Sequence, residues 1–413
     1  MTARRSVLLV HQNFPGQFPH IARALLARGD RVAAIGSASA RGMPGVDLRR
    51  WSNAKSTTPG LFPHAVRAEA DLIRAAAAAD TAVGLRRDGF MPDVIIGNPG
   101  WGETLHLKEV WPEAKLILLG EYYYVARGGD LGFDPEFTAP DFGVADAVAL
   151  NARNATQAFA YVLADRIVCP TPFQASTFPA SLRERITVHH EGIDIAAASR
   201  RPAARMVLPD GKVLVAGDPV VTFISRTLEP LRGFHIFMRA LPALLAERPD
   251  AHVVVIGTDA EQGYGAAAPG GSTWKDAMLR ELGGRIDLAR VHFLGRVPHA
   301  TMVAALSLSA AHVYLTYPFV LSWSLIEAMA CGCLIVGSDT APVRDAIVPG
   351  ENGLLVDFFD VAGLSVRLVE AVSHPASFMQ LREGARATVV RRYDASAVGI
   401  PGWLSLIDDV ISA

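Results

Sequence analysis

The chain has 413 residues, of which half are hydrophobic, and its formal net charge is −2. This length exceeds what one hydrophobic core usually organises, so we expect two or three domains. The nearly balanced charge gives no electrostatic footprint for nucleic acid. No apolar run approaches the roughly 18 residues of a membrane-spanning helix, so the composition predicts a soluble protein.

Cysteine usage and the first residues predict a cytoplasmic location. Cys169, Cys331 and Cys333 cannot all pair, and their spacing is that of neither a disulfide scaffold nor a zinc site. The apolar run Val7–Val10 follows two arginines but is far shorter than the core of a signal peptide. We therefore expect reduced, buried thiols and a first β-strand near the N-terminus.

Strand-like and helix-like segments alternate through the first half of the chain. Residues Ser6–Val10 predict a strand, and apolar residues then recur at helical spacing from Phe18 to Leu26, before Gly29 ends the helix. Further buried strands are expected at 32–35, 94–96, 116–119 and 167–169. This alternation is typical of a doubly wound α/β domain.

The pattern lapses and then restarts, which predicts two similar domains. Prolines, arginines and a Pro-Asp-Gly turn make residues 201–218 a candidate linker. Strands are expected beyond it at 220–224, 253–256, 291–294, 313–316, 334–336 and 354–356. We predict a first domain over 1–200, a second over 219–390, and a terminal helix over 391–413 that packs back on the first domain.

The segment Ser322–Cys333 places one carboxylate, Glu327, among small and apolar residues. A strand is expected just before it, and apolar residues from Leu325 to Ala330 follow helical spacing. A helix that begins after a buried strand directs its free N–H groups toward the ligand crevice, where phosphates bind. A first-turn acid also complements the helix dipole, so Glu327 taken alone fits a capping role equally well.

Several segments together resemble one family, the retaining GT-B glycosyltransferases of family 4. The most specific is Leu325–Val356, LIEAMACGCLIVGSDTAPVRDAIVPGENGLLV, which is similar to the family's donor-site helix, strand and Glu-Asn-Gly-Leu turn. The resemblance covers nearly the whole chain. It implies a GT-B fold of two Rossmann-like domains facing a cleft, with a C-terminal helix crossing back to the first. It also implies a nucleotide sugar as co-substrate and no cofactor.

Two arginines fall where the family binds the donor diphosphate. Phe223–Leu241 resembles the segment that carries an Arg and a basic residue before Gly, and these positions are Arg226 and Arg232 here, with Gly233 next. Negative charge grows on the leaving diphosphate as the sugar–phosphate bond breaks, and fixed cations stabilise it. An isolated arginine is more often part of a surface ion pair, so their position after a strand favours function.

Glu327 matches the second glutamate of the family's E-x₇-E pattern, which implies hydrogen bonds to the ribose hydroxyls. The first glutamate is missing, because residue 319 is phenylalanine. Backbone N–H groups and serine hydroxyls at the helix start would still hold phosphate, and the segment VHFLGRVPH resembles the base-binding turn. The predicted catalytic residues are Arg226, Arg232 and Glu327; the predicted donor-binding residues are Gly16, Arg296, Val297, Ser322, Trp323, Ser324, Leu325 and Glu327.

The first domain offers weaker matches. His11–Ala22 resembles the loop after the first strand, where Gly16 would let the backbone approach the diphosphate. In Ile95–Leu105 the histidine of many family members is absent, and Asn98 lies nearest its position. Asparagine cannot act as a base, so we predict sugar or acceptor contacts from Asn98, Trp101 and Glu103. His11, His20 or His106 could take the place of the absent family histidine, although a lone histidine is more often structural.

These residues predict a retaining, metal-independent transferase that moves a hexose from a nucleotide sugar to an acceptor hydroxyl. UDP is the nucleotide that the resemblance favours, and the sequence has no Asp-x-Asp to hold a divalent ion. The acceptor is left open between a carbohydrate, a lipid-linked group, a protein and a small molecule. Peripheral contact with the inner membrane face is also left open.

A second interpretation is a GT-B nucleotide-binding protein with weak or lost transferase activity. Phe319 and Asn98 support it, whereas the retained Arg226, Arg232 and Glu327 argue against it. An epimerase would need its own acid pair and a glycogen-phosphorylase-like enzyme a cofactor lysine, and neither signature is evident. The sequence has no Gly-x-Gly-x-x-Gly and no phosphate-loop Gly-Lys-Ser/Thr, which argues against oxidoreductases and ATPases.

Overall fold

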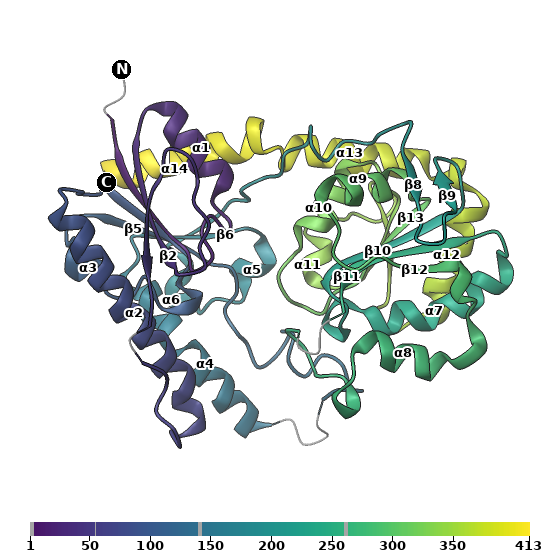
Figure 1. Cartoon of the computed structure of the whole chain (residues 1–413), viewed down its shortest axis with the longest axis horizontal. Coiled ribbons are helices and arrows are strands. Elements are labelled where there is room, and N and C mark those ends of the chain that lie inside the picture. Colours follow the sequence, from purple (N-terminus) through teal and green to yellow (C-terminus); the bar gives the residue numbers. More distant parts are fainter. Residues whose placement is uncertain (1–3, 54, 139–142, 260–262) are drawn as a thin grey trace. The chain divides into compact units, whose positions relative to one another are not determined.

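The computed structural model describes residues 4–53, 55–138, 143–259 and 263–413. The chain forms two compact units, each an α/β domain built on a parallel sheet (Figure 1). Unit 1 comprises residues 1–132, 139–191 and 395–413, and unit 2 comprises residues 133–138 and 192–394. The predicted fold class, two Rossmann-like domains of the GT-B type, is confirmed.

Unit 1 contains a seven-stranded parallel sheet in the order β3-β2-β1-β4-β5-β6-β7. The strands are β1 Ser6–Val10, β2 Arg31–Ser37, β3 Asp47–Trp51, β4 Val94–Gly97, β5 Lys115–Leu119, β6 Arg166–Cys169 and β7 Ile186–Val188. The helices are α1 Pro19–Arg28, α2 Pro63–Arg87, α3 Leu107–Val110, α4 Val144–Leu163, α5 Pro172–Ser176, α6 Ala180–Arg183 and α14 Ile400–Ser412.

Both faces of this sheet are buried, because successive residues of a strand point to opposite sides. In β1, Leu8 and Val10 enter a core shared with α2 and α4, while Val7 and Leu9 enter a second core shared with α1 and α14. Trp403 and Ile407 of α14 complete that second core. The predicted return of the terminal helix to the first domain is therefore confirmed.

Unit 2 contains a six-stranded parallel sheet in the order β12-β11-β10-β13-β14-β15. The strands are β10 Val220–Thr227, β11 His252–Thr258, β12 Val291–Phe293, β13 Ala311–Tyr314, β14 Ile335–Ser338 and β15 Leu354–Val356. The helices are α7 Phe234–Glu247, α8 Trp274–Leu282, α9 His299–Leu308, α10 Trp323–Ala330, α11 Ala341–Arg344, α12 Val361–Ser373 and α13 Met379–Arg392. Among the described residues, no helix combines the length and the apolar character needed to cross a bilayer.

The predicted domain boundaries differ from the structure at the linker. Residues 201–218 belong to unit 2, where they form an antiparallel hairpin of β8 Arg205–Val207 and β9 Val213–Val215. Met206 and Leu214 face each other and enter the unit 2 core. The alternation of these two buried residues with exposed neighbours is a strand pattern, which the surrounding prolines and arginines obscured. Unit 1 ends its central segment at Glu191, and the residues after it already belong to unit 2.

Candidate donor and acceptor sites

The sheet of unit 2 has a topological switch point between β10 and β13. The chain runs from β10 through β11 to β12 on one side and resumes at β13 on the other, although β10 and β13 are hydrogen-bonded neighbours. Ligands of doubly wound sheets bind at the carboxyl ends of the strands at such a point. Arg226 lies near the carboxyl end of β10 and Arg232 in the loop after it, while Phe319 and Ser322 follow β13, so predicted donor residues from two distant segments lie near this switch point.

Arg232 is the better fixed of the two predicted cations. Its Nη1 donates to Thr316 Oγ1 at 2.9 Å and to the Val320 carbonyl at 3.1 Å, and its guanidinium carbon lies 5.8 Å from the Phe319 ring centre. Gly233, with φ of 68°, allows this approach because a Cβ there would overlap the Leu315 side chain. The Arg-Gly pair therefore places a charged side chain directly on the β13–α10 loop.

Arg226 is exposed and is held by one residue. Its Nη1 donates to the Tyr264 hydroxyl at 2.8 Å, and its guanidinium carbon lies 5.5 Å from that ring centre. Tyr264 is 56% exposed and approaches Phe319, with 6.0 Å between ring centres. Arg226 therefore reaches the glycine- and alanine-rich loop between β11 and α8.

Glu229, which no sequence motif indicated, anchors the same loop. Its Oε2 accepts hydrogen bonds from the backbone N–H groups of Tyr264 and Gly265, at 2.6 and 2.9 Å. Burial raises the pKa of this carboxyl group, while the two N–H donors act to lower it. A lone acidic residue before a proline carried no recognisable signal, because its partners lie 35 and 36 residues away.

The start of α10 is capped by its own serine. Ser322 Oγ accepts from the N–H of Ser324, the N–H of Leu325 donates to the Ser322 carbonyl, and the N–H of Ser322 donates to the Tyr314 hydroxyl. The Leu325 side chain is fully buried in the core. A phosphate bound here would accept hydrogen bonds from these N–H groups in place of the capping oxygens. Leu325 would contribute only its backbone N–H, because its side chain is buried.

Glu327 pairs with His299, the last residue of the segment VHFLGRVPH. His299 Nε2 lies 2.6 Å from Glu327 Oε1, and His299 is the first residue of α9. Arg296 and Val297 belong to the turn just before this helix; Arg296 is exposed, and Val297 packs against the core. The predicted base-binding turn and the predicted ribose ligand are therefore adjacent.

One group of three metal-type ligands occurs within the described ranges of the chain. Oxygen or nitrogen atoms of Asp134, Glu136 and His235 lie within 4.8 Å of one another. Both oxygens of Glu136 accept from Arg239, at 2.7 and 2.8 Å, and Asp134 accepts from the Tyr317 hydroxyl at 2.6 Å. These partners already compensate the two carboxylates, so the group does not resemble an open cation site.

Unit 1 has its own switch point between β1 and β4, and the loops after these strands carry the predicted residues of the first domain. Asn98 Nδ2 donates to Gln17 Oε1 at 2.9 Å and to Glu121 Oε2 at 3.1 Å. Gly16 has φ of 50°, and a Cβ there would overlap the His11 imidazole. Asn98 is thus hydrogen-bonded to the residue that follows Gly16.

Glu103 lies inside unit 1 rather than on its surface. It is 0% exposed, and neither of its carboxylate oxygens has a hydrogen-bond partner among the described residues. Burial raises its pKa to about 7. Trp101 lies against His11, with ring centres 5.1 Å apart, and burial lowers the pKa of His11 to about 4. In this arrangement Glu103 is enclosed by unit 1, and its predicted contact with an acceptor stays a prediction.

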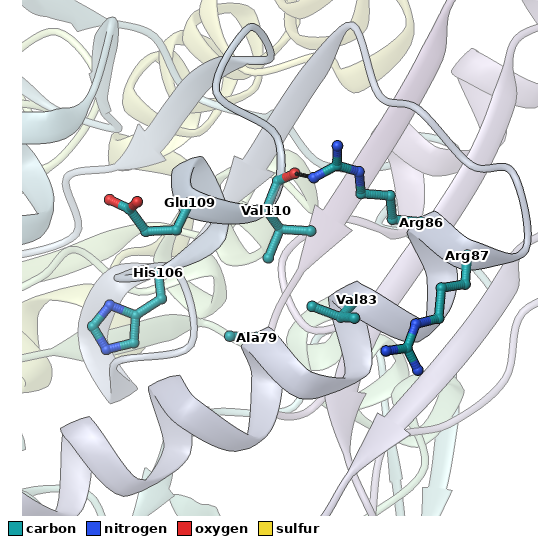
Figure 2. Close-up of a pocket in the computed structure, with 7 residues that line it drawn as sticks. All are labelled: Ala79, Val83, Arg86, Arg87, His106, Glu109 and Val110. Carbon is teal, nitrogen blue, oxygen red and sulfur yellow. Dashed lines mark hydrogen bonds between the residues drawn. The ribbon is translucent and has the colours of Figure 1, made fainter.

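A hollow of about 590 Å³ lies in unit 1, between α2 and the segment from His106 to Val110. Figure 2 shows the residues that line it. Arg86, Arg87, His106 and Glu109 supply its polar lining, together with three apolar residues. It contains none of the predicted sugar or acceptor contacts. His106, weighed as a substitute for the missing histidine, lines this hollow.

Comparison with known families divides the chain as the structure does. Residues 28–198 match the family described as Glycosyl transferase family 4 group, and residues 218–374 match Glycosyl transferases group 1. The fold and these matches define a GT-B glycosyltransferase architecture. The chain belongs to the family 4, group 1 glycosyltransferases.

Curated relatives match about half of the chain. A phosphatidyl-myo-inositol mannosyltransferase of Mycolicibacterium smegmatis is 32% identical over 215 residues, which are 50% of this chain and 48% of that protein. A D-inositol 3-phosphate glycosyltransferase of Rhodococcus jostii is 29% identical over 198 residues, 48% of this chain and 42% of that protein. The chain thus spans about half the length of the curated relatives it matches.

Solved structures match the fold over the full length. A sucrose-phosphate synthase from Thermosynechococcus elongatus superposes with a TM-score of 0.72 at 16% identity, covering 99% of this chain and 100% of that one. Anabaena HepE, solved in complex with UDP and glucose, superposes with a TM-score of 0.66 at 16% identity, covering 98% and 99%. At this level of identity, the similarity supports the fold alone.

Proposed function

We propose that this protein is a retaining, metal-independent glycosyltransferase that transfers a hexose from a nucleotide sugar, with UDP as its nucleotide, to an acceptor hydroxyl. The observation that carries the proposal is the position of two cations at the switch point of unit 2: Arg232 is hydrogen-bonded to Thr316 and Val320, just before α10, and Arg226 lies near the carboxyl end of the neighbouring strand β10. Family membership supports the same donor class.

In this proposal, the predicted donor-site residues bind different parts of the nucleotide sugar. Arg232 and Arg226 stabilise the charge that develops on the leaving diphosphate, and Arg232 needs little rearrangement because Thr316 and Val320 already fix it. Glu327, oriented by His299, accepts hydrogen bonds from the ribose hydroxyls. Cations at the leaving group serve the purpose that a divalent metal serves in other transferases.

The transfer step is a substitution at the anomeric carbon with retained configuration. The acceptor hydroxyl enters on the face from which the diphosphate departs. The bond from its oxygen to the anomeric carbon forms, the bond from that carbon to the phosphate oxygen breaks, and the acceptor proton passes to the departing phosphate oxygen. No side-chain base is required, which accommodates Asn98 where a histidine is usual. Positioning and leaving-group stabilisation supply the rate enhancement.

Thermal unfolding with UDP, GDP, ADP and dTDP in turn, without added metal, tests the donor site. A nucleotide at a hundredfold excess over its Kd should stabilise the protein by about 2.7 kcal/mol. We expect UDP to raise the melting temperature of the wild type and to have little effect on Arg226→Ala. Arg367→Ala, which removes an arginine of an exposed ion pair on α12, is the matched control. No shift with any nucleotide would contradict the proposal.

The names of the relatives supply the first acceptors to test. Radiolabelled donor sugar should be offered with phosphatidyl-myo-inositol in vesicles and with D-inositol 3-phosphate in solution. Product formed only on vesicles would indicate a lipid-linked acceptor and peripheral membrane contact, and product formed in solution would indicate a small-molecule acceptor. Nucleotide binding without transfer to any acceptor would favour a GT-B binding protein with lost activity.

A further inference from the structure

A short segment, Phe133–Thr138, belongs to unit 2 although the chain up to Gly132 belongs to unit 1. We call it the docking arm. Phe133 lies among three aromatic rings of unit 2, with ring centres 5.0 Å from Tyr317, 5.2 Å from Phe358 and 5.3 Å from Phe359. Phe137 contacts His235 and Trp274 at 5.3 and 5.0 Å. Apolar contacts therefore fix both ends of the arm.

Between these rings the arm buries a carboxylate. Asp134 is 3% exposed; its Oδ2 accepts from the Tyr317 hydroxyl at 2.6 Å and lies 3.0 Å from His235 Nε2. Burial opposes ionisation of Asp134, but the contacts with His235 and Tyr317 outweigh it and hold its pKa below the usual value. A charged acceptor in such a place makes a stronger hydrogen bond than a neutral one.

The partners of the arm are the residues that flank the donor site. Tyr317 directly follows Thr316, which holds Arg232, and its N–H donates to the Leu231 carbonyl. His235 lies in the first turn of α7, three residues after Arg232. Trp274 Nε1 donates to the Ala266 carbonyl in the loop that Glu229 anchors. The arm thus contacts residues that adjoin Arg232, and it contacts Trp274, which is hydrogen-bonded to the loop that Arg226 touches.

We propose that Asp134 is a positioning residue for the donor site: through Tyr317 and His235 it holds Arg232 and the loop Thr316–Ser322 in the geometry that stabilises the leaving diphosphate. The expected effect on catalysis rests on the proposed function. The role of Asp134 in ordering the loop Thr316–Ser322 rests on the contacts alone. Because residues on both sides of the arm belong to unit 1, a segment of the acceptor-side half of the sequence completes the donor site.

Two variants and one control test this role. Tyr317→Phe keeps the ring against Phe133 and removes only the hydroxyl that Asp134 accepts from. Asp134→Asn keeps the shape and removes the charge. Glu281→Gln removes a carboxylate that shares Arg239 with Glu136 but touches neither Tyr317 nor His235. Circular dichroism and melting temperature establish that each variant is folded.

The first measurement is hydrogen–deuterium exchange of residues Thr316–Ser322 in the protein without ligand. A hydrogen bond to a charged group shifts a local equilibrium by roughly tenfold or more. We therefore expect exchange at least roughly tenfold faster in Tyr317→Phe and Asp134→Asn, and unchanged exchange in Glu281→Gln. Unchanged exchange in the first two, or equal acceleration in all three, would overturn the positioning role whether or not the protein is a transferase.

The second measurement separates positioning from simple stability. Arg232 interacts most strongly with charge that appears in the transition state, so its misplacement should lower kcat by roughly tenfold while the donor KM changes less than about threefold. A lower melting temperature with unchanged kcat and KM would assign the arm a purely structural role. Absence of nucleotide binding and transfer in the wild type would contradict the proposed function, while the exchange result would still decide the role of Asp134.

Discussion

The two switch points of this protein handle polar groups in opposite ways. In unit 2 the end of β10 and the loop after it present an exposed Arg226 and a half-buried Arg232, each held by neutral acceptors. In unit 1 the loop after β4 buries Asn98 and Glu103. A leaving diphosphate requires available positive charge, whereas an acceptor is chosen by shape and local hydrogen bonds. If the proposed function holds, accessible positive charge lies in the unit that binds the donor.

The largest expected effect comes from removing the better-fixed cation. Arg232→Ala should lower kcat by roughly 10²- to 10³-fold, as loss of a preorganised donor to developing negative charge does. Arg226→Ala should lower it less, because Arg226 is held only through the exposed Tyr264. Steady-state kinetics with the donor identified by thermal shift provides the measurement.

Arg232→Lys sharpens this prediction. A lysine cannot reproduce the planar guanidinium that reaches Thr316, Val320 and the Phe319 ring together. We expect little rescue of kcat. Full rescue by lysine would mean that only the positive charge at this position matters. The additional contacts that hold Arg232 more firmly than Arg226 would then contribute nothing to catalysis.

The buried polar groups of unit 1 should make its stability depend on pH. Glu103 has a pKa of about 7 in the folded protein against an ordinary value of 4.5, so the folded state holds its proton more tightly than the unfolded state. Stability is then fully retained below about pH 4.5 and is lost as the pH rises toward 7. The shift corresponds to about 3 kcal/mol, and denaturant unfolding at pH 5 and 8 should reveal it.

Glu103→Gln is the variant that isolates this effect. His11 acts in the opposite direction: its pKa is lowered to about 4, so it withdraws stability as the pH falls below its ordinary value of 6.5. Its contribution is common to wild type and variant and cancels in their difference. If that difference is the same at pH 5 and at pH 8, Glu103 is not the titrating group.

The smallest expected effect concerns the phenylalanine that replaces the first family glutamate. Phe319→Leu removes the ring beside the Arg232 guanidinium, an interaction worth about 0.5–1 kcal/mol at a partly exposed site. Nucleotide Kd measured by calorimetry should therefore rise roughly two- to fivefold. Phe90→Leu, which removes the ring beside Arg31 in unit 1, is the matched control and should leave Kd unchanged; an equal rise in both would trace the effect to general packing.

Local sequence signals predicted most of the fold but only part of the site. Strands such as Ser6–Val10 and helices such as Trp323–Ala330 follow from hydrophobic periodicity and were predicted within one or two residues. Arg226, Arg232 and Glu327 carried a family pattern. Glu229, Asp134 and His299 did not, because their roles depend on partners 28 to 183 residues distant in the sequence. The hairpin at 205–215 was missed because turn residues dominated a weak strand pattern.

The placement of α14 in unit 1 has a consequence for synthesis on the ribosome. Trp403 and Ile407 fill the same core as Val7 and Leu9 of the first strand, yet they are translated almost 400 residues later. Unit 1 is therefore translated first but completes its core last. One face of its sheet stays incompletely covered while the residues of unit 2 are synthesised. Nascent chains that end before residue 395 should bind holdase chaperones through that face, and addition of α14 should release them.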